Sequence, residues 1–119
     1  IFSPCDGRIS AVENSMPDHT PPARDTDNPA GNYVLIECGD AEVLLAHMQH
    51  GSVTVAVNDH VSSGEPLGKV GNSGNTTEPH LHIHAERDGE PGVILDGKAV
   101  PITIAGRYLV RNSVFRGIE

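Results

Sequence analysis

Two runs rich in apolar and β-branched residues decide the fold: Tyr33-Val-Leu-Ile-Glu-Cys38 and Glu42-Val-Leu-Leu-Ala-His-Met48. Branched side chains such as Val and Ile favour extended backbone because they pack well on a pleated surface. Gly39-Asp40 lies between the runs, where a tight hairpin turn needs residues that tolerate unusual backbone angles. The pattern therefore predicts two neighbouring antiparallel strands.

Shorter runs of the same kind lie on both sides of this hairpin. We expect further strands from near Arg8 and at 53–57, 66–70 and 80–85, with weaker β-like segments at 92–95 and 99–104. Turn-forming residues separate the runs, and no segment has helical periodicity. The predicted fold class is all-β, an antiparallel twisted sheet arranged as a sandwich or barrel.

The stretch from residue 13 to residue 31 breaks this pattern. It holds four prolines, several aspartates and almost no apolar residue. Proline lacks the amide donor that a central strand needs, and carboxylates resist burial. We expect an exposed loop that borders the functional site.

Composition limits the possible partners. The chain has 119 residues, the length of one domain, and 8 Lys and Arg against 16 Asp and Glu give a formal net charge of −8. Such a surface repels phosphate backbones, so no nucleic acid is expected as a partner. No apolar run approaches the roughly 20 residues of a spanning helix, so no membrane insertion is expected in this chain.

The two cysteines, Cys5 and Cys38, are not in Cys-x-x-Cys spacing. They could form one disulfide, but the sequence favours two separate buried thiols.

The segment His80-Leu-His-Ile-His84 alternates imidazole with aliphatic side chains. In a strand, residues two apart share a face and lie about 6.6 Å apart, so three imidazoles would line one face, with Leu81 and Ile83 on the buried side. Imidazole is a common transition-metal ligand and titrates near neutral pH, so the row indicates a metal and proton-transfer site. The alternative is a solvated strand face that happens to carry His.

His47 interrupts an apolar run where a strand should end, a position typical of site residues. A structural, hydrogen-bonded role is the alternative for a single His there. His19, His50 and His60 lie in turn-like contexts and are interpreted as surface residues.

Three segments in order, Leu45-Ala-His47-Met48, the Gly-rich stretch from Asp59 to Gly74, and Glu78-Pro-His80-Leu-His82, resemble the lysostaphin-type zinc metallopeptidases. These enzymes cut peptide cross-links in bacterial peptidoglycan. The opening Ser3-Pro-Cys-Asp-Gly-Arg-Ile9 extends the resemblance from near Phe2 to about Glu86. It implies a twisted antiparallel barrel-sandwich hybrid with a groove, a zinc cofactor and a metal-activated water that attacks an amide carbonyl.

The resemblance also implies roles for individual residues. His82 matches the third zinc ligand, and His47 and His80 match the pair of catalytic histidines that do not bind the metal. The family takes its first two ligands from a His and an Asp upstream of the first core strand, so we expect them outside this sequence. His84 replaces the usual Glu and could add to the metal shell.

Four other residues are weaker candidates. Glu78 and Asp59 could hold an imidazole tautomer, although plain solvated charge is the simpler interpretation. Asp18 and His19 lie in the Pro-rich loop, at the wrong topological position to replace the upstream ligands.

We therefore expect a single domain over 1–119, with a core at about 2–86 and a C-terminal extension at 87–119. The predicted function is a zinc-dependent endopeptidase domain that acts on peptidoglycan peptides in the cell envelope, periplasmic or extracellular. On its own, this piece is expected to bind zinc weakly and to leave peptidoglycan intact. The alternatives are a non-catalytic member of the fold that binds cell wall or a partner enzyme, and a phosphocarrier-like domain of similar fold.

Overall fold

The computed structural model describes residues 1–104 and 107–108. This part of the chain forms eight strands: β1 (Gly7–Glu13), β2 (Asn32–Cys38), β3 (Ala41–Met48), β4 (His60–Val61), β5 (His82–Arg87), β6 (Lys98–Val100), β7 (Thr103–Ile104) and β8 (Arg107–Tyr108). The described residues contain no helix that could cross a membrane.

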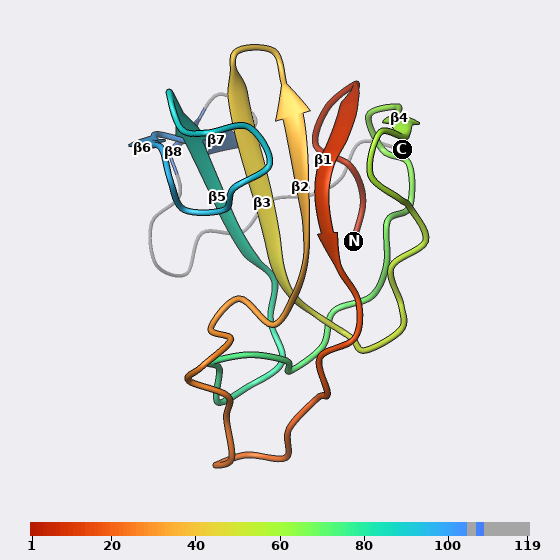
Figure 1. Cartoon of the computed structure of the whole chain (residues 1–119), viewed down its shortest axis with the longest axis vertical. Helices are drawn as coiled ribbons and strands as arrows, with labels where there is room; N and C mark the ends of the chain where they lie inside the picture. Colours follow the sequence, from red (N-terminus) through yellow and green to blue (C-terminus); the bar gives the residue numbers. More distant parts are fainter. Residues whose placement is uncertain (105–106, 109–119) are drawn as a thin grey trace.

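Six of the strands form one antiparallel sheet in the order β4-β1-β2-β3-β5-β6 (Figure 1). The central hairpin pairs β2 with β3 as predicted, with Cys38 opposite Ala41. The all-β antiparallel class is confirmed. The sheet stays open, with β4 and β6 at its two edges, and does not close into a barrel.

The two faces of the sheet carry different apolar clusters. The main core contains Ile36, Val43 and Ala85 on one face, and a smaller cluster of Leu35, Leu44 and Ala46 lies on the other. Ile36 is opposite Val43, and Leu35 is opposite Leu44, so the two clusters follow the period-two alternation of paired strands.

The part of the chain between β3 and β5 covers the main core and is mostly irregular. The strands predicted at 53–57 and 66–70 are absent, and only Pro66 and Val70 make isolated bridges. Val53 and Val55 pack on the core, which explains their apolar alternation without ladder pairing. An alternating run predicts which side chains are buried. It does not predict strand pairing, because a segment that lies over the sheet can bury the same side chains without hydrogen-bonding to it.

The C-terminal extension takes part in the sheet. β6 pairs with β5, placing Val100 opposite Ala85, so the edge lies beyond the expected core boundary. The segment predicted at 92–95 forms turns instead of a strand, and the one at 99–104 divides between β6 and β7. Residues 105–106 and 109–119 of the extension lie outside the described residues.

Cys5 and Cys38 form a disulfide, with their Cα atoms 5.9 Å apart. The expectation of two separate thiols is therefore wrong. The antiparallel register of β1 and β2 places Arg8 opposite Glu37, which brings the residue before β1 beside the end of β2. Sequence spacing alone does not reveal this proximity, because it depends on which strands pair.

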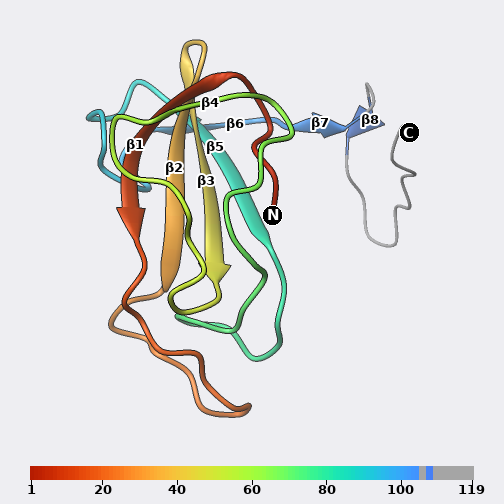
Figure 2. The same ribbon diagram turned by 90° about the vertical axis from the view of Figure 1, so that its right-hand side faces the viewer.

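The loop at 14–31 projects from one end of the sheet, beside the segment at 71–79 (Figures 1 and 2). Most of its residues are exposed, as predicted. Main-chain hydrogen bonds tie it to that segment: Asp25 donates to the Gly74 carbonyl at 3.0 Å, and Asn75 donates to the Pro29 carbonyl at 2.9 Å. These two segments frame the end of β3.

Candidate active site

Three imidazoles meet where β3 ends and β5 begins. His82 is the first residue of β5 and follows His80, and Ala46 of β3 lies opposite His82. The ring centroid of His47 is 4.9 Å from that of His80 and 5.8 Å from that of His82. One ring nitrogen from each of the three lies within 4.8 Å of the others. The predicted convergence of these histidines is confirmed.

A bulge turns His47 toward this cluster. Strict alternation after Leu45 would place the His47 side chain on the main-core face and Met48 on the other face, yet Met48 belongs to the main core. The ladder between β2 and β3 shifts register between Asn32 and Val34, and His47 has a φ of 61°. An extra residue in one strand re-aims side chains, which is how the bulge serves this site.

Backbone and ring contacts hold His47 in place. Its amide donates to the Ala30 carbonyl at 3.0 Å, and its Nδ1 lies 2.9 Å from the Ser73 carbonyl oxygen. Because a carbonyl oxygen only accepts, Nδ1 carries the proton and Nε2 keeps its lone pair. Burial lowers the pKa of His47, the Ser73 contact partly opposes this, and His80 and His82 lower the pKa further.

His80 is oriented in the same way. Its Nδ1 lies 2.9 Å from the Glu78 carbonyl oxygen and 3.1 Å from Oγ1 of Thr76. The Thr76 hydroxyl donates to the same Glu78 carbonyl at 2.8 Å. Nδ1 of His80 is therefore the donor, and its Nε2 also keeps a free lone pair. Sequence reasoning missed these orienting groups because main-chain carbonyls leave no signature in residue identity.

The donor set fits a transition-metal ion such as zinc. Partial burial lowers the pKa of His82, and His84 and His80 lower it further, so the neutral form that binds metals is favoured. At the usual bond length, two ligand atoms of a tetrahedral zinc ion lie about 3.4 Å apart. The ring nitrogens of the three histidines lie within 4.8 Å of one another, a slightly wider spacing. The exposed ring of His82 can rotate toward an ion, whereas the ring of His80 is held by its Nδ1 contacts.

The predicted histidine row is only partly a strand. His82 and His84 lie on β5 with ring centroids 6.5 Å apart, but His80 precedes the strand, and Leu81 is 38% exposed instead of buried. His84 lies outside the three-histidine group, and its Nε2 is 3.7 Å from Oε2 of the buried Glu86.

The weaker candidates have structural roles. Glu78 orients His80 through its main-chain carbonyl, not its carboxylate. The carboxylate of Asp59 accepts from the Ala56 amide and closes a turn beside β4. The carboxylate of Asp18 accepts from the amides of His50 and Asn72, which ties the loop to the segment at 71–79.

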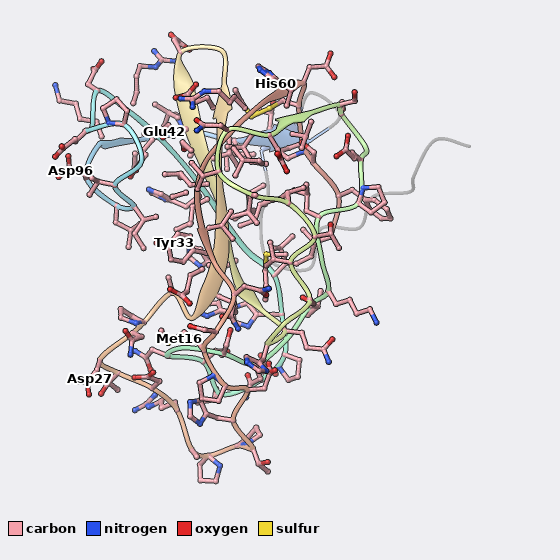
Figure 3. The ribbon with its side chains drawn as sticks, turned by 45° about the vertical axis from the view of Figure 1, so that its right-hand side comes forward. Met16, Asp27, Tyr33, Glu42, His60 and Asp96 are labelled. Atoms are coloured by element: carbon pink, nitrogen blue, oxygen red, sulfur yellow. A yellow bond between two sulfur atoms is a disulfide. The ribbon has the colours of Figure 1, made fainter. Side chains whose placement is uncertain are left out.

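The remaining histidines lie outside the cluster, as predicted. Neither His19 nor His50 belongs to the three-histidine group. His60 lies on β4 opposite Arg8, at the end of the sheet away from the cluster (Figure 3).

A hollow of about 250 Å³ lies beside His47 and His82. Its other lining residues are mostly small or apolar: Pro29, Ala30, Leu44, Ala46, Asn75 and Leu95. Imidazole nitrogens that could hold a metal ion therefore lie beside a hollow, an arrangement that can support metal-assisted hydrolysis.

Comparison with known proteins identifies the family. The profile of Peptidase family M23 matches residues 1–93, and the chain belongs to this family. It is 36% identical over 62 residues to the peptidoglycan DD-endopeptidase ShyA of Vibrio cholerae, a match that covers 52% of this chain and 14% of ShyA. The chain spans only 12–14% of the length of the curated relatives it matches.

Solved structures show the same fold. The catalytic domain of a mutant of the prophage-encoded M23 protein EnpA from Enterococcus faecalis superposes with a TM-score of 0.62 at 23% identity, over 84% of this chain and 64% of that one. A zinc-containing peptidase from Vibrio cholerae gives a TM-score of 0.52 at 24% identity, over 68% of this chain and 21% of that one.

Proposed function

We propose that the chain is part of a zinc-dependent endopeptidase that cleaves peptide cross-links of bacterial peptidoglycan. Membership of Peptidase family M23 supports this, and so does the similarity to a peptidoglycan DD-endopeptidase. The observation that carries the proposal is the convergence of His47, His80 and His82, the first and last of which line the hollow of about 250 Å³. Family membership favours this function over a phosphocarrier.

The roles proposed for the histidines follow from their geometry. His82 would hold the ion, and zinc when bound lowers the pKa of a coordinated water and polarises the amide carbonyl. His47 and His80 would act as the catalytic pair. Each is anchored through Nδ1, which leaves its Nε2 free, and His47 also lines the hollow.

A free Nε2 is the group that amide hydrolysis requires from a side chain. It can accept a proton from an attacking water and, once protonated, can donate to the oxyanion or to the leaving amine. Two such groups with ring centroids 4.9 Å apart can divide these tasks between them. The lowered pKa of His47 keeps its ring neutral in the resting enzyme, ready to act as a base.

We propose that the protein works in the cell envelope. The Cys5–Cys38 disulfide supports this location because structural disulfides persist in oxidising compartments such as the periplasm and the extracellular space. The net charge of −8 is consistent with the absence of nucleic-acid partners.

The test is hydrolysis of purified sacculi by the full-length natural protein. We expect release of soluble peptide fragments that stops after chelation and returns when zinc is added. A His82→Gln variant should release none, and a His60→Gln variant, changed far from the cluster, should match the wild type. Binding to sacculi without hydrolysis would identify a non-catalytic member of the family.

The expectation that the 119-residue chain alone binds zinc weakly and does not hydrolyse peptidoglycan stays a prediction. It follows from a site that supplies His82 as its only proposed ligand, whereas catalytic zinc usually has three protein ligands. Calorimetric titration of the chain with zinc tests it directly.

A further inference from the structure

A second hollow, of about 290 Å³, adjoins the one beside the histidines. Both are lined by Pro29, Ala30 and Leu95, so the two hollows share a wall. Ala30 also accepts the amide hydrogen bond of His47, which connects this wall to the histidine cluster. The second hollow therefore lies next to the one that contains His47 and His82.

Three parts of the chain build the second hollow. Glu13 at the end of β1 lies opposite Tyr33 at the start of β2, and the loop contributes Asp27. Ile94 and Leu95 of the turn segment before β6 close the other side. Figure 3 shows Tyr33, Met16 and Asp27 along one side of the molecule, from the sheet into the loop.

The charge of the second hollow is negative. Glu13 and Asp27 line it, and no Lys, Arg or His does. Glu13 is held through Oε1, which accepts from the amides of Asn14 and Ser15 and from the Ser15 hydroxyl. These hydrogen bonds lower the pKa of Glu13, so the group stays anionic, and Oε2 makes no hydrogen bond within the described residues.

Polar and apolar lining together set the chemistry of a ligand. The Tyr33 hydroxyl stays protonated because burial and the neighbouring Glu13 raise its pKa, so it offers a neutral hydrogen-bonding group. Met16, Ala30, Ile94 and Leu95 supply apolar surface for an alkyl stem. Carboxylates near such a surface suit a cationic head on an aliphatic chain.

We propose that this second hollow, which we call the acidic subsite, binds a substrate residue that carries a free amine on an alkyl side chain. The inference rests on the proposed peptidase function, because it assigns the ligand to the peptide being cleaved. A bare divalent ion fits less well, since the described residues gather metal-type ligands only at His47, His80 and His82. An acidic side chain would be repelled by Glu13 and Asp27.

The first test measures binding without hydrolysis. Two uncleaved peptides that differ only in acetylation of one side-chain amine are titrated into the metal-free, full-length protein and followed by NMR. We expect the free-amine peptide to bind roughly tenfold more tightly, the usual scale for a charge-assisted hydrogen bond, with shift changes at Tyr33 and Asp27. Equal affinities, or shift changes confined to other residues, would overturn the proposal.

Variants assign the preference to the subsite. Asp27→Asn should reduce the preference for the free amine, because the Asp27 carboxylate makes no side-chain hydrogen bond within the described residues and its loss changes charge alone. Asp40→Asn, the same change in an exposed residue of the β2–β3 turn, should leave the preference intact. A preference that survives in Asp27→Asn and in the Glu13→Gln, Asp27→Asn double variant would contradict the assignment.

The binding and hydrolysis results separate the two proposals. A binding preference at the acidic subsite without cleavage of sacculi would contradict the peptidase function and leave the subsite standing. Cleavage of free-amine and acetylated substrates with equal kcat/KM would contradict the subsite and leave the peptidase function standing.

Discussion

His47 combines three features that rarely occur in one residue. It is buried, has a φ of 61°, and presents a free Nε2 to two other imidazoles. A left-handed backbone at a residue other than Gly costs about 1–2 kcal/mol, so the surrounding contacts must hold it there. The Ala30 and Ser73 carbonyls supply those contacts.

Replacing His47 with Asn should strongly reduce catalysis while preserving the fold. Asn tolerates the left-handed conformation better than most residues, so the bulge should survive. Loss of a catalytic imidazole typically lowers kcat by a factor of about 10² to 10⁴. The check compares sacculus hydrolysis with the thermal unfolding midpoint. Retention of full activity would contradict the role proposed for His47.

Stability of the metal-free protein should fall as the pH drops below about 6.5, the ordinary pKa of His. The pKa values of His47 and His82 are lowered in the folded state, so the unfolded chain binds protons more readily. Above that pH neither state binds these protons, so the two histidines cost no stability. Below it the loss of stability grows until the pH has fallen past their pKa values in the folded state. Denaturant unfolding at several pH values measures this, and His47→Asn should flatten the decline. An unchanged slope in the variant would contradict the burial of a neutral ring.

At the scale of elements, a buried polar node joins the loop, the end of β3 and the segment at 71–79. The Ser73 hydroxyl donates to the Met48 carbonyl at 2.6 Å and accepts from the Asn32 amide at 3.0 Å. The Asn32 side-chain amide donates to the carbonyls of Met16 and Met48. This node fixes the Ser73 carbonyl that orients His47.

Ser73→Ala should destabilise the protein by about 1–3 kcal/mol, because the Asn32 amide and the Met48 carbonyl lose a buried partner. Activity should also fall, since the Ser73 carbonyl would no longer be held against His47. Chemical denaturation and sacculus hydrolysis measure the two effects. Ser62→Ala, on an exposed residue, serves as the matched control. Equal stability of both variants would show that the node contributes nothing.

Parts of the site could be predicted from the sequence, and the reasons are specific. Alternation around His82 and the resemblance in residue order identified the three histidines. At His47, strand alternation predicts the wrong face for the side chain, because the bulge shifts the register. No residue type in the sequence indicates this bulge. The Gly-Asn-Ser-Gly stretch matched a family pattern, and the structure explains why its last residue is Gly. A Cβ on Gly74 would lie 2.5 Å from the Gly31 amide nitrogen, which is too close for any other residue.

The errors in the fold prediction also have physical causes. Val53 and Val55 are alternately buried, so their pattern imitates a strand, but their backbone lies in a covering layer. The disulfide depends on the pairing of β1 with β2, which local sequence does not specify.

At the scale of the whole molecule, the sheet has two differently built ends. The histidine cluster and its two framing segments lie at one end, and the Cys5–Cys38 disulfide joins the residues before β1 to the end of β2 near the other. The disulfide therefore constrains the scaffold without contacting the site.

Replacing both Cys5 and Cys38 with Ser should lower the free energy of unfolding by up to about 4 kcal/mol, the loop-entropy value for a bridge that spans 33 residues. Sacculus hydrolysis below the new unfolding midpoint should stay close to wild type, because the cluster lies at the other end of the sheet. Denaturation with and without a reductant provides the comparison. A wild-type protein that is insensitive to reduction would contradict the scaffold role of the disulfide.

The central claim is that His47, His80 and His82 surround a single zinc site. Anomalous X-ray diffraction at the zinc edge, on crystals of the full-length protein grown with zinc, tests it most directly. We expect one strong peak about 2.1 Å from a ring nitrogen of His82, with the rings of His47 and His80 beside it. A peak elsewhere, or no peak at His82 in zinc-saturated crystals, would contradict it.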